Sequence, residues 1–220
     1  MIKTLVVLTK SRKDGDYCIA CKDLKTGEWI RLIDNDINKH NSIKKSKFFN
    51  SEGKSINLLD VVRVDVRLPF NKNHSQPENW VLNNYKFEPN GRYKEYVLDK
   101  LEDNYDNIFY DNNRTIRKEI IEEKPKVYSL QLVTAEVLII KINLNKEHRL
   151  KADIKYNGNW LSDIDITDED FVNRHYDKVE SENSLTLNCI KIVVSLAEEF
   201  NNRHFKLIAA IFDGNEYVSF

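Results

Sequence analysis

The polar side chains best suited to ligand recognition gather in one short stretch of the chain, residues 74–80, which reads HSQPENW. Gln and Asn amides offer paired donors and acceptors that can read a base edge, and an imidazole can stack, donate a hydrogen bond or titrate. A loop that ties itself down is the alternative, because proline fixes φ and polar loop side chains often bond backbone groups. The candidate ligand contacts here are His74, Gln76, Glu78, Asn79 and Trp80.

A second candidate pairs an aromatic ring with a guanidinium. Trp29 and Arg31 flank Ile30 on one expected strand, so they share a face. Together they can stack a base and hold a phosphate. The alternative is that Trp29 packs inward and Arg31 pairs with an acid.

Two further groups complete the candidate binding residues. Lys10, Arg12 and Lys13 follow the first apolar run and would supply salt-sensitive phosphate contacts, although each also fits a simple solvated turn. Tyr156 and Trp160 lie on either side of Asn157–Gly158 and can form a second stacking platform, or pack against each other across a hairpin.

Signatures of an enzyme or a metal site are missing from the sequence. Cys18 and Cys21 have CxxC spacing but lie in an expected strand without a second pair, so neither a four-ligand zinc site nor a redox motif is indicated. The chain has no GxGxxG, GxxxxGK, HExxH or GxSxG motif. We therefore expect no catalytic residue, no metal and no cofactor.

The elements that must position these residues are mostly strands. Ile2–Thr9 is a continuous apolar run, residues 59–68 alternate strictly, and Asn157–Gly158 is a strong hairpin signal between two further strands. Residues 34–57 are polar and lysine-rich, as in a long loop or helix-bearing insertion. Spacings of three to four between 92 and 123 predict one or two helices, and Thr167 can cap a later one.

This pattern predicts a mainly β fold with a few helices, built as two tandem OB-like five-stranded barrels. We expect a first barrel in residues 1–90, a helical connector in residues 91–128 and a second barrel in residues 129–220. In such barrels the loop after the first strand, which carries Lys10, Arg12 and Lys13, commonly contacts ligand.

Composition and charge limit the setting of the protein. The 220 residues include three cysteines, an odd number that argues against a disulfide framework. No run approaches the roughly 20 apolar residues of a membrane span, so we expect a cytoplasmic protein. Residues 1–75 carry 15 Lys and Arg against 9 Asp and Glu, a charge of +6, while the remainder carries −7. This asymmetry fits one basic face or an ordinary solvated surface.

Four stretches in this order resemble the dual OB-containing domain family of prokaryotes: residues 18–33, 58–80, 154–168 and 193–212. The resemblance implies a pair of OB barrels that bind nucleic acid and belong to bacterial conflict and defence systems. The chain departs from the family pattern at Cys21, where glycine is frequent, and at Leu32, where proline is frequent.

Three functions follow as hypotheses. The first is a non-catalytic module that binds nucleic acid, in single-stranded form. The second is a nucleotide-acting enzyme or small-ligand sensor with a pocket at the HSQPEN loop. The third is a protein-interaction adaptor for the product of a neighbouring gene.

Overall fold

Alternating side chains build the strands of the first barrel. In β4 (Asp60–Arg67) the side chains of Val62, Val64 and Val66 are buried, whereas Arg63 and Arg67 are exposed. A strand with one face on a core has this period of two. The other strands of this barrel are β1 (Ile2–Lys13), β2 (Asp16–Asp23), β3 (Trp29–Ile33) and β5 (Asn79–Leu82).

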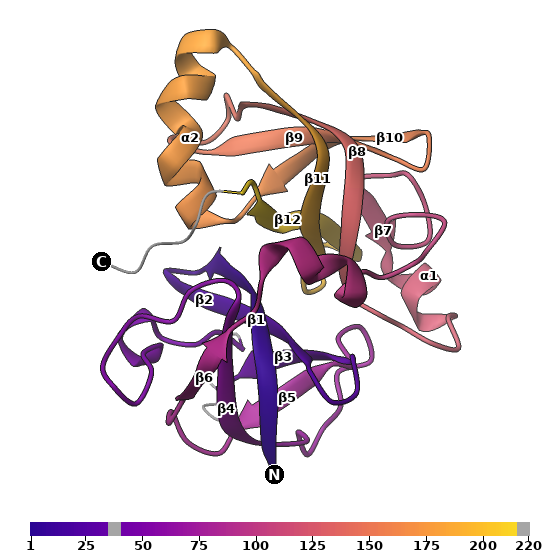
Figure 1. Ribbon diagram of the computed structural model, residues 1–220. Coiled ribbons are helices and arrows are strands. Elements are labelled where there is room, and N and C mark those ends of the chain that lie inside the picture. Colours follow the sequence, from indigo (N-terminus) through magenta and orange to yellow (C-terminus); the bar gives the residue numbers. More distant parts are fainter. Residues whose placement is uncertain (35–40, 215–220) are drawn as a thin grey trace. The chain divides into compact units, whose positions relative to one another are not determined.

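The computed structural model, which describes residues 1–34 and 41–214, closes these five strands into a barrel (Figure 1). Their order is β1-β2-β3-β5-β4, and β4 returns to β1 in antiparallel register, with Ile2 opposite Asp65 and Val6 opposite Val61. The pairing of β3 with β5 is parallel. An additional strand, β6 (Glu88–Arg92), pairs with the start of β4.

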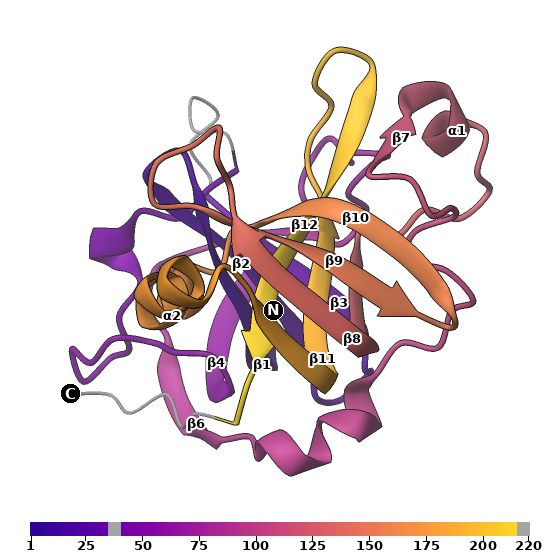
Figure 2. The same cartoon turned by 90° about the horizontal axis from the view of Figure 1, so that it is seen from above.

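The second barrel repeats this connectivity. Its strands are β8 (Leu130–Ile142), β9 (Leu150–Tyr156), β10 (Asn159–Ile166), β11 (Leu185–Leu196) and β12 (Arg203–Phe212). They follow the order β10-β9-β8-β11-β12, and the parallel pairing of β10 with β12 closes the barrel. Figure 2 shows β10, β9, β8 and β11 side by side. The predicted fold of two tandem five-stranded OB-like barrels is confirmed.

The remaining elements are short. The 3-10 helices are η1 (Lys45–Lys47) and η2 (Glu95–Leu101), strand β7 (Thr115–Arg117) pairs with β12, and the α-helices are α1 (Lys118–Glu122) and α2 (Glu169–Glu182). The expected connector at residues 91–128 thus contains η2, β7 and α1. The chain divides into two compact units: Met1–Asn73 with Pro77–Leu101 and Gly214 form one, and His74–Gln76 with Glu102–Asp213 form the other.

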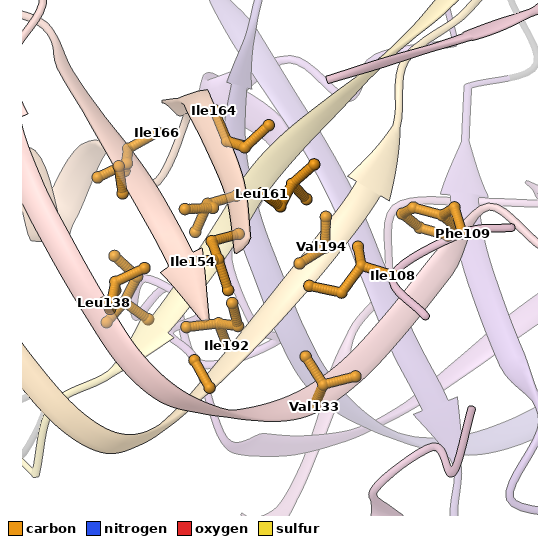
Figure 3. Close-up of a cluster of buried hydrophobic side chains, with 14 of the residues drawn as sticks. Ile108, Phe109, Val133, Leu138, Ile154, Leu161, Ile164, Ile166, Ile192 and Val194 are labelled. Carbon is orange, nitrogen blue, oxygen red and sulfur yellow. The ribbon is translucent and has the colours of Figure 1, made fainter. Parts of the chain in front are cut away.

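The core of the second barrel is aliphatic. Along β9, Leu150, Ala152 and Ile154 are buried and alternate with the more exposed Lys151 and Asp153. Figure 3 shows Ile154 among the side chains of Leu138, Leu161 and Ile192, which come from β8, β10 and β11. The β9–β10 hairpin turns at Asn157 and Gly158, whose φ values of 47° and 76° suit a two-residue turn with both φ angles positive.

Asp168, and not the expected Thr167, caps α2. One carboxylate oxygen of Asp168 accepts a hydrogen bond from Phe171 N at 3.0 Å, and the other accepts one from Ile211 N at 3.0 Å. The Thr167 hydroxyl instead donates to the Ile208 carbonyl. Burial raises the pKa of Asp168 to about 6, against the opposing effect of the two backbone donors.

The titration of Asp168 predicts a pH-dependent stability. Because the folded state raises this pKa, the contribution of the carboxyl group is greatest below about pH 4 and is lost as the pH rises to about 6. We expect the free energy of unfolding of the wild type, minus that of Asp168→Asn, to fall by up to about 3 kcal/mol over this interval. Urea titrations at several pH values measure the difference, and a constant or rising value would contradict the assignment.

A buried lysine fixes the connector against the second barrel. The Lys206 side chain is fully buried, and its Nζ donates to the carbonyl oxygens of Ile108 and Asp111 and to the Asp111 carboxylate, at 2.6–2.9 Å. Between these anchors, Phe109 and Tyr110 adopt left-handed φ values of 47° and 57°. The ammonium group therefore holds a strained turn in place.

We expect Lys206→Met to lower the free energy of unfolding by about 3 kcal/mol, because it leaves three buried or half-buried acceptors without their cation. Lys178, which is exposed on α2, offers a matched control. Its substitution by Met should change stability by less than about 0.5 kcal/mol. Equal effects of the two substitutions in chemical denaturation would show that the Lys206 contacts contribute nothing.

Candidate nucleic-acid interface

Trp29 and Arg31 share the outer face of β3. In the β2–β3 register Trp29 lies opposite Lys22 and Arg31 lies opposite Ala20, while the intervening Ile30 is buried in the core. The Lys22 ammonium lies 5.0 Å from the centre of the Trp29 ring and donates to the Leu101 carbonyl at 2.6 Å. The indole is therefore already in contact with a cation.

Arg31 pairs with an acid from the stretch HSQPENW. Its Nε and Nη2 donate to Glu78 Oε1 at 3.2 and 3.0 Å, and its Nη1 lies 3.1 Å from Cys18 Sγ. Burial alone lowers the pKa of Arg31, but Cys18 and Glu78 more than offset this effect and raise it. The guanidinium thus joins β2, β3 and the start of β5, as the alternative interpretation of Arg31 expected.

This pair predicts a non-additive effect on stability. Removal of one partner deprives a buried charge of its bidentate ion pair, so Arg31→Met and Glu78→Met should each lower the free energy of unfolding by about 3 kcal/mol. The double variant should lose much less than the sum of the two. A double-mutant cycle by urea denaturation measures the coupling, and additive losses would mean that the two groups act independently.

The remaining residues of HSQPENW are divided between the two units. His74 and Gln76 belong to the second unit, where His74 Nε2 lies 3.3 Å from the Ile121 carbonyl and Gln76 Nε2 donates to the Leu196 carbonyl. Asn79 and Trp80 begin β5 of the first barrel, and Lys3 Nζ lies 4.7 Å from the Trp80 ring. The five candidate residues of this stretch therefore do not form one site within either barrel.

The two candidates of the second barrel are separate as well. The Tyr156 hydroxyl donates to the Tyr105 carbonyl at 2.6 Å, which ties β9 to the preceding connector. Trp160 lies on β10 opposite Lys155, with 46% of its surface exposed. The structure brings Tyr156 to the connector, whereas the Trp160 ring remains accessible.

The three basic candidates of the first barrel lie on the last part of β1, and not in the loop after the first strand as expected, and one of them, Lys10, contacts an aromatic ring. The β1–β2 hairpin turns at Asp14 and Gly15, with φ values of 50° and 86°, and places Arg12 opposite Tyr17 and Lys13 opposite Asp16. The Lys10 ammonium lies 5.7 Å from the centre of the Tyr17 ring. It also donates to the Asn57 side chain at 3.3 Å.

The lysine-rich segment supplies another cation to the same ring. Backbone hydrogen bonds join Tyr17 and Ile43 in both directions, at 2.9 and 2.8 Å, and the Lys45 N–H donates to the Asp16 carboxylate. These bonds place the Lys45 ammonium 5.0 Å from the centre of the Tyr17 ring. We call this group, at one end of the first barrel, the Tyr17 cluster; its members are Lys10, Arg12, Lys13, Tyr17 and Lys45.

Two contacts extend the cluster. From the same η1 turn, the Lys47 ammonium lies 4.0 Å from the centre of the Tyr85 ring. The Phe48 ring packs edge-on against Tyr17, with ring centres 6.1 Å apart. The sequence analysis did not select Tyr17, Lys45, Lys47 or Tyr85. Its one relevant signal was the lysine-rich composition of residues 34–57.

Metal ligands do not gather among the residues that the structure describes: no three His, Cys, Asp or Glu side chains are placed to hold an ion. Burial raises the pKa of the Cys21 thiol, whereas Cys18 faces Arg31. No helix within residues 1–34 and 41–214 is long and apolar enough to cross a membrane. A shallow depression of about 220 Å³ beside β4 and β6 contains none of the predicted binding residues.

Comparison with known protein families identifies the family to which the chain belongs. The model of the dual OB-containing domain matches residues 3–211, nearly the whole chain. The chain belongs to this family. A crystal structure of the tetrameric p202 HIN2 is similar to the dual OB-containing domain over 96% of this chain and 94% of that chain, at 8% identity and a TM-score of 0.29. No curated protein matches.

Lysines of both barrels of this dual OB-containing domain bond carboxylates across neighbouring strands. In the second barrel, β8 and β9 are the counterparts of β1 and β2, and three of their lysines bond carboxylates: Lys141 with Asp153, Lys151 with Asp163 and Lys155 with Glu136. In the first barrel Lys3 of β1 binds Asp23 of β2 at 2.6 Å, and Lys10, Lys45 and Lys47 lie over aromatic rings. The Tyr17 cluster gathers several cations at one end of the first barrel and is therefore a candidate surface for a polyanion.

Proposed function

We propose that this dual OB-containing domain is a binding module for nucleic acid and that the Tyr17 cluster of its first barrel is the contact surface. The observation that carries the proposal is the convergence of Lys10 and Lys45 on the Tyr17 ring beside Arg12 and Lys13. Lys10, Arg12 and Lys13 lie on β1 next to the β1–β2 turn, and the loop between the first two strands binds ligand in OB folds. Proteins with this fold have many different functions, so the side chains of the cluster, and not the barrel itself, support nucleic-acid binding.

Phosphate binding by the cluster predicts an affinity that depends on the salt concentration. Each phosphate that a Lys or Arg neutralises releases counterions, so the affinity falls as the salt concentration rises. Lys10 is buried, so if the three more exposed cations of the cluster, Arg12, Lys13 and Lys45, each meet one phosphate, log Kd should rise with log[salt] with a slope of about 2 for a single strand. The positive charge of residues 1–75 supports this attraction.

The direct test is titration of a labelled single-stranded oligonucleotide, followed by fluorescence anisotropy at several salt concentrations. We expect micromolar or tighter binding in low salt, and a slope reduced by about 1 or more in the double variant Arg12→Glu/Lys45→Glu. The matched control is Lys25→Glu/Lys178→Glu, which makes the same charge change at two exposed positions away from the cluster. Lys25 lies beyond the other end of β2, roughly 25 Å along the strand.

Three outcomes would contradict the proposal. Absence of binding at micromolar protein in low salt would remove nucleic acid as the ligand. Equal losses in the two double variants would remove the Tyr17 cluster as the contact surface. A mononucleotide that binds as well as the oligonucleotide would favour the small-ligand hypothesis instead. The defence role implied by the family resemblance and the cytoplasmic location stay predictions.

A further inference from the structure

Three exposed side chains of the second barrel lie in one row where β12 pairs with β7. The backbones of Phe200 and Arg203 exchange two hydrogen bonds, of 2.8 and 3.1 Å, across a turn at Asn201 and Asn202. Arg203 in turn lies opposite Arg117 of β7. Because directly opposed residues of antiparallel strands point to the same face, the Phe200 ring and the two guanidinium groups share one face. We call Phe200, Arg203 and Arg117 the Arg117 row.

The local structure fixes this row at the surface. Ile116 and His204, which pair beside it, are buried. Arg117 and Arg203 are exposed, and 65% of the Phe200 surface is accessible. The turn has φ values of 52° and 59°, which suit a two-residue hairpin with both angles positive. Figure 2 shows β7, which belongs to the connector and not to the barrel, beside the turn that joins β11 to β12.

The two guanidinium groups of the row keep their charge. Within residues 1–34 and 41–214, no carboxylate is placed to bond Arg117 or Arg203. Arg203 Nη1 donates to the Thr115 hydroxyl at 3.0 Å, which uses one of its five N–H donors. The adjacent Lys118, in contrast, binds Glu199 at 2.9 Å. Like charges directly opposite each other in a sheet are destabilising, so the free protein gains no stability from this pair.

An anion that binds both guanidinium groups would relieve their repulsion. A phosphate accepts paired hydrogen bonds from arginine, and an exposed aromatic ring that stacks a base contributes roughly 5- to 150-fold to affinity. Neighbouring strands lie about 4.8 Å apart, so the row extends over about 10 Å. A nucleotide offers both a phosphate and a flat base, whereas a run of Asp and Glu side chains offers no ring for Phe200.

We infer that the Arg117 row is a second contact surface for nucleic acid, in which Arg117 and Arg203 bind phosphate and Phe200 stacks a base of a single strand. This inference rests on the proposed function and adds to it a site on the second barrel, built from residues other than the Tyr17 cluster. The sequence analysis selected none of the three residues.

The experiment follows two labelled single strands of about 15 nucleotides by fluorescence anisotropy, one with ordinary bases and one abasic throughout. Arg117→Gln should weaken both strands at least about threefold and lower the salt slope by about 0.7, because one phosphate contact is lost. Phe200→Leu should weaken the ordinary strand about fivefold or more and leave the abasic strand unchanged. Lys178→Gln removes one charge from the exposed face of α2 and should change neither affinity.

Thermal unfolding separates a binding role of Arg117 from a structural one. Arg117→Gln should leave the Tm unchanged or slightly higher, because it relieves the repulsion between β7 and β12. A lower Tm together with weaker binding would make Arg117 a structural residue and overturn the inference.

The remaining outcomes distinguish the inference from the proposed function. If Arg117→Gln and Phe200→Leu bind a strand as tightly as the wild type does, the inference fails and the Tyr17 cluster stays the contact surface. If the wild type binds neither strand, the proposed function fails and the inference with it. If a glutamate-rich peptide displaces the strand and Phe200→Leu has no effect, the row binds an acidic protein and the inference is overturned.

Discussion

The parallel pairing of the third and fifth strands is the constraint on which each barrel depends, because it closes the sheet. In both barrels an acid lies at this seam. Glu78 precedes β5, binds the Arg31 side chain and accepts the Arg31 backbone N–H through its carbonyl at 2.8 Å. Asp168 follows β10 and accepts the Ile211 N–H of β12. Two buried acids thus hold the seams together.

The strands could be predicted from the sequence because their signals are local. Alternation in β4 and the Asn157–Gly158 turn need only a few neighbouring residues, and the structure confirms both. The cap of α2 could not be decided in this way. Thr167 and Asp168 both suit a helix start, and the contact that singles out Asp168 comes from Ile211, 43 residues away.

The candidate site was harder to predict, because its contacts join residues that are far apart in the sequence. The period of a strand placed Trp29 and Arg31 on one face, but it could not reveal that Glu78, 47 residues further on, binds the guanidinium. Lys10, Arg12 and Lys13 were selected from their position after the first strand. The contact of Lys10 with Tyr17 was missed, and so was that of Lys45, which reaches the same ring through the pairing of Tyr17 with Ile43.

Lysines on the surfaces of the two barrels are positioned in two different ways. A lysine bound to a carboxylate, such as Lys155 with Glu136, is positioned but neutralised. A lysine over an aromatic ring is positioned by the ring quadrupole and keeps its full charge. The second arrangement orders a cation without consuming its attraction for an anion, which is the property that a surface for polyanions requires. Both arrangements occur in the first barrel, where Lys3 binds Asp23 and Lys45 lies over Tyr17. Since both barrels share one connectivity, any difference in what they bind must come from such side chains and not from the topology.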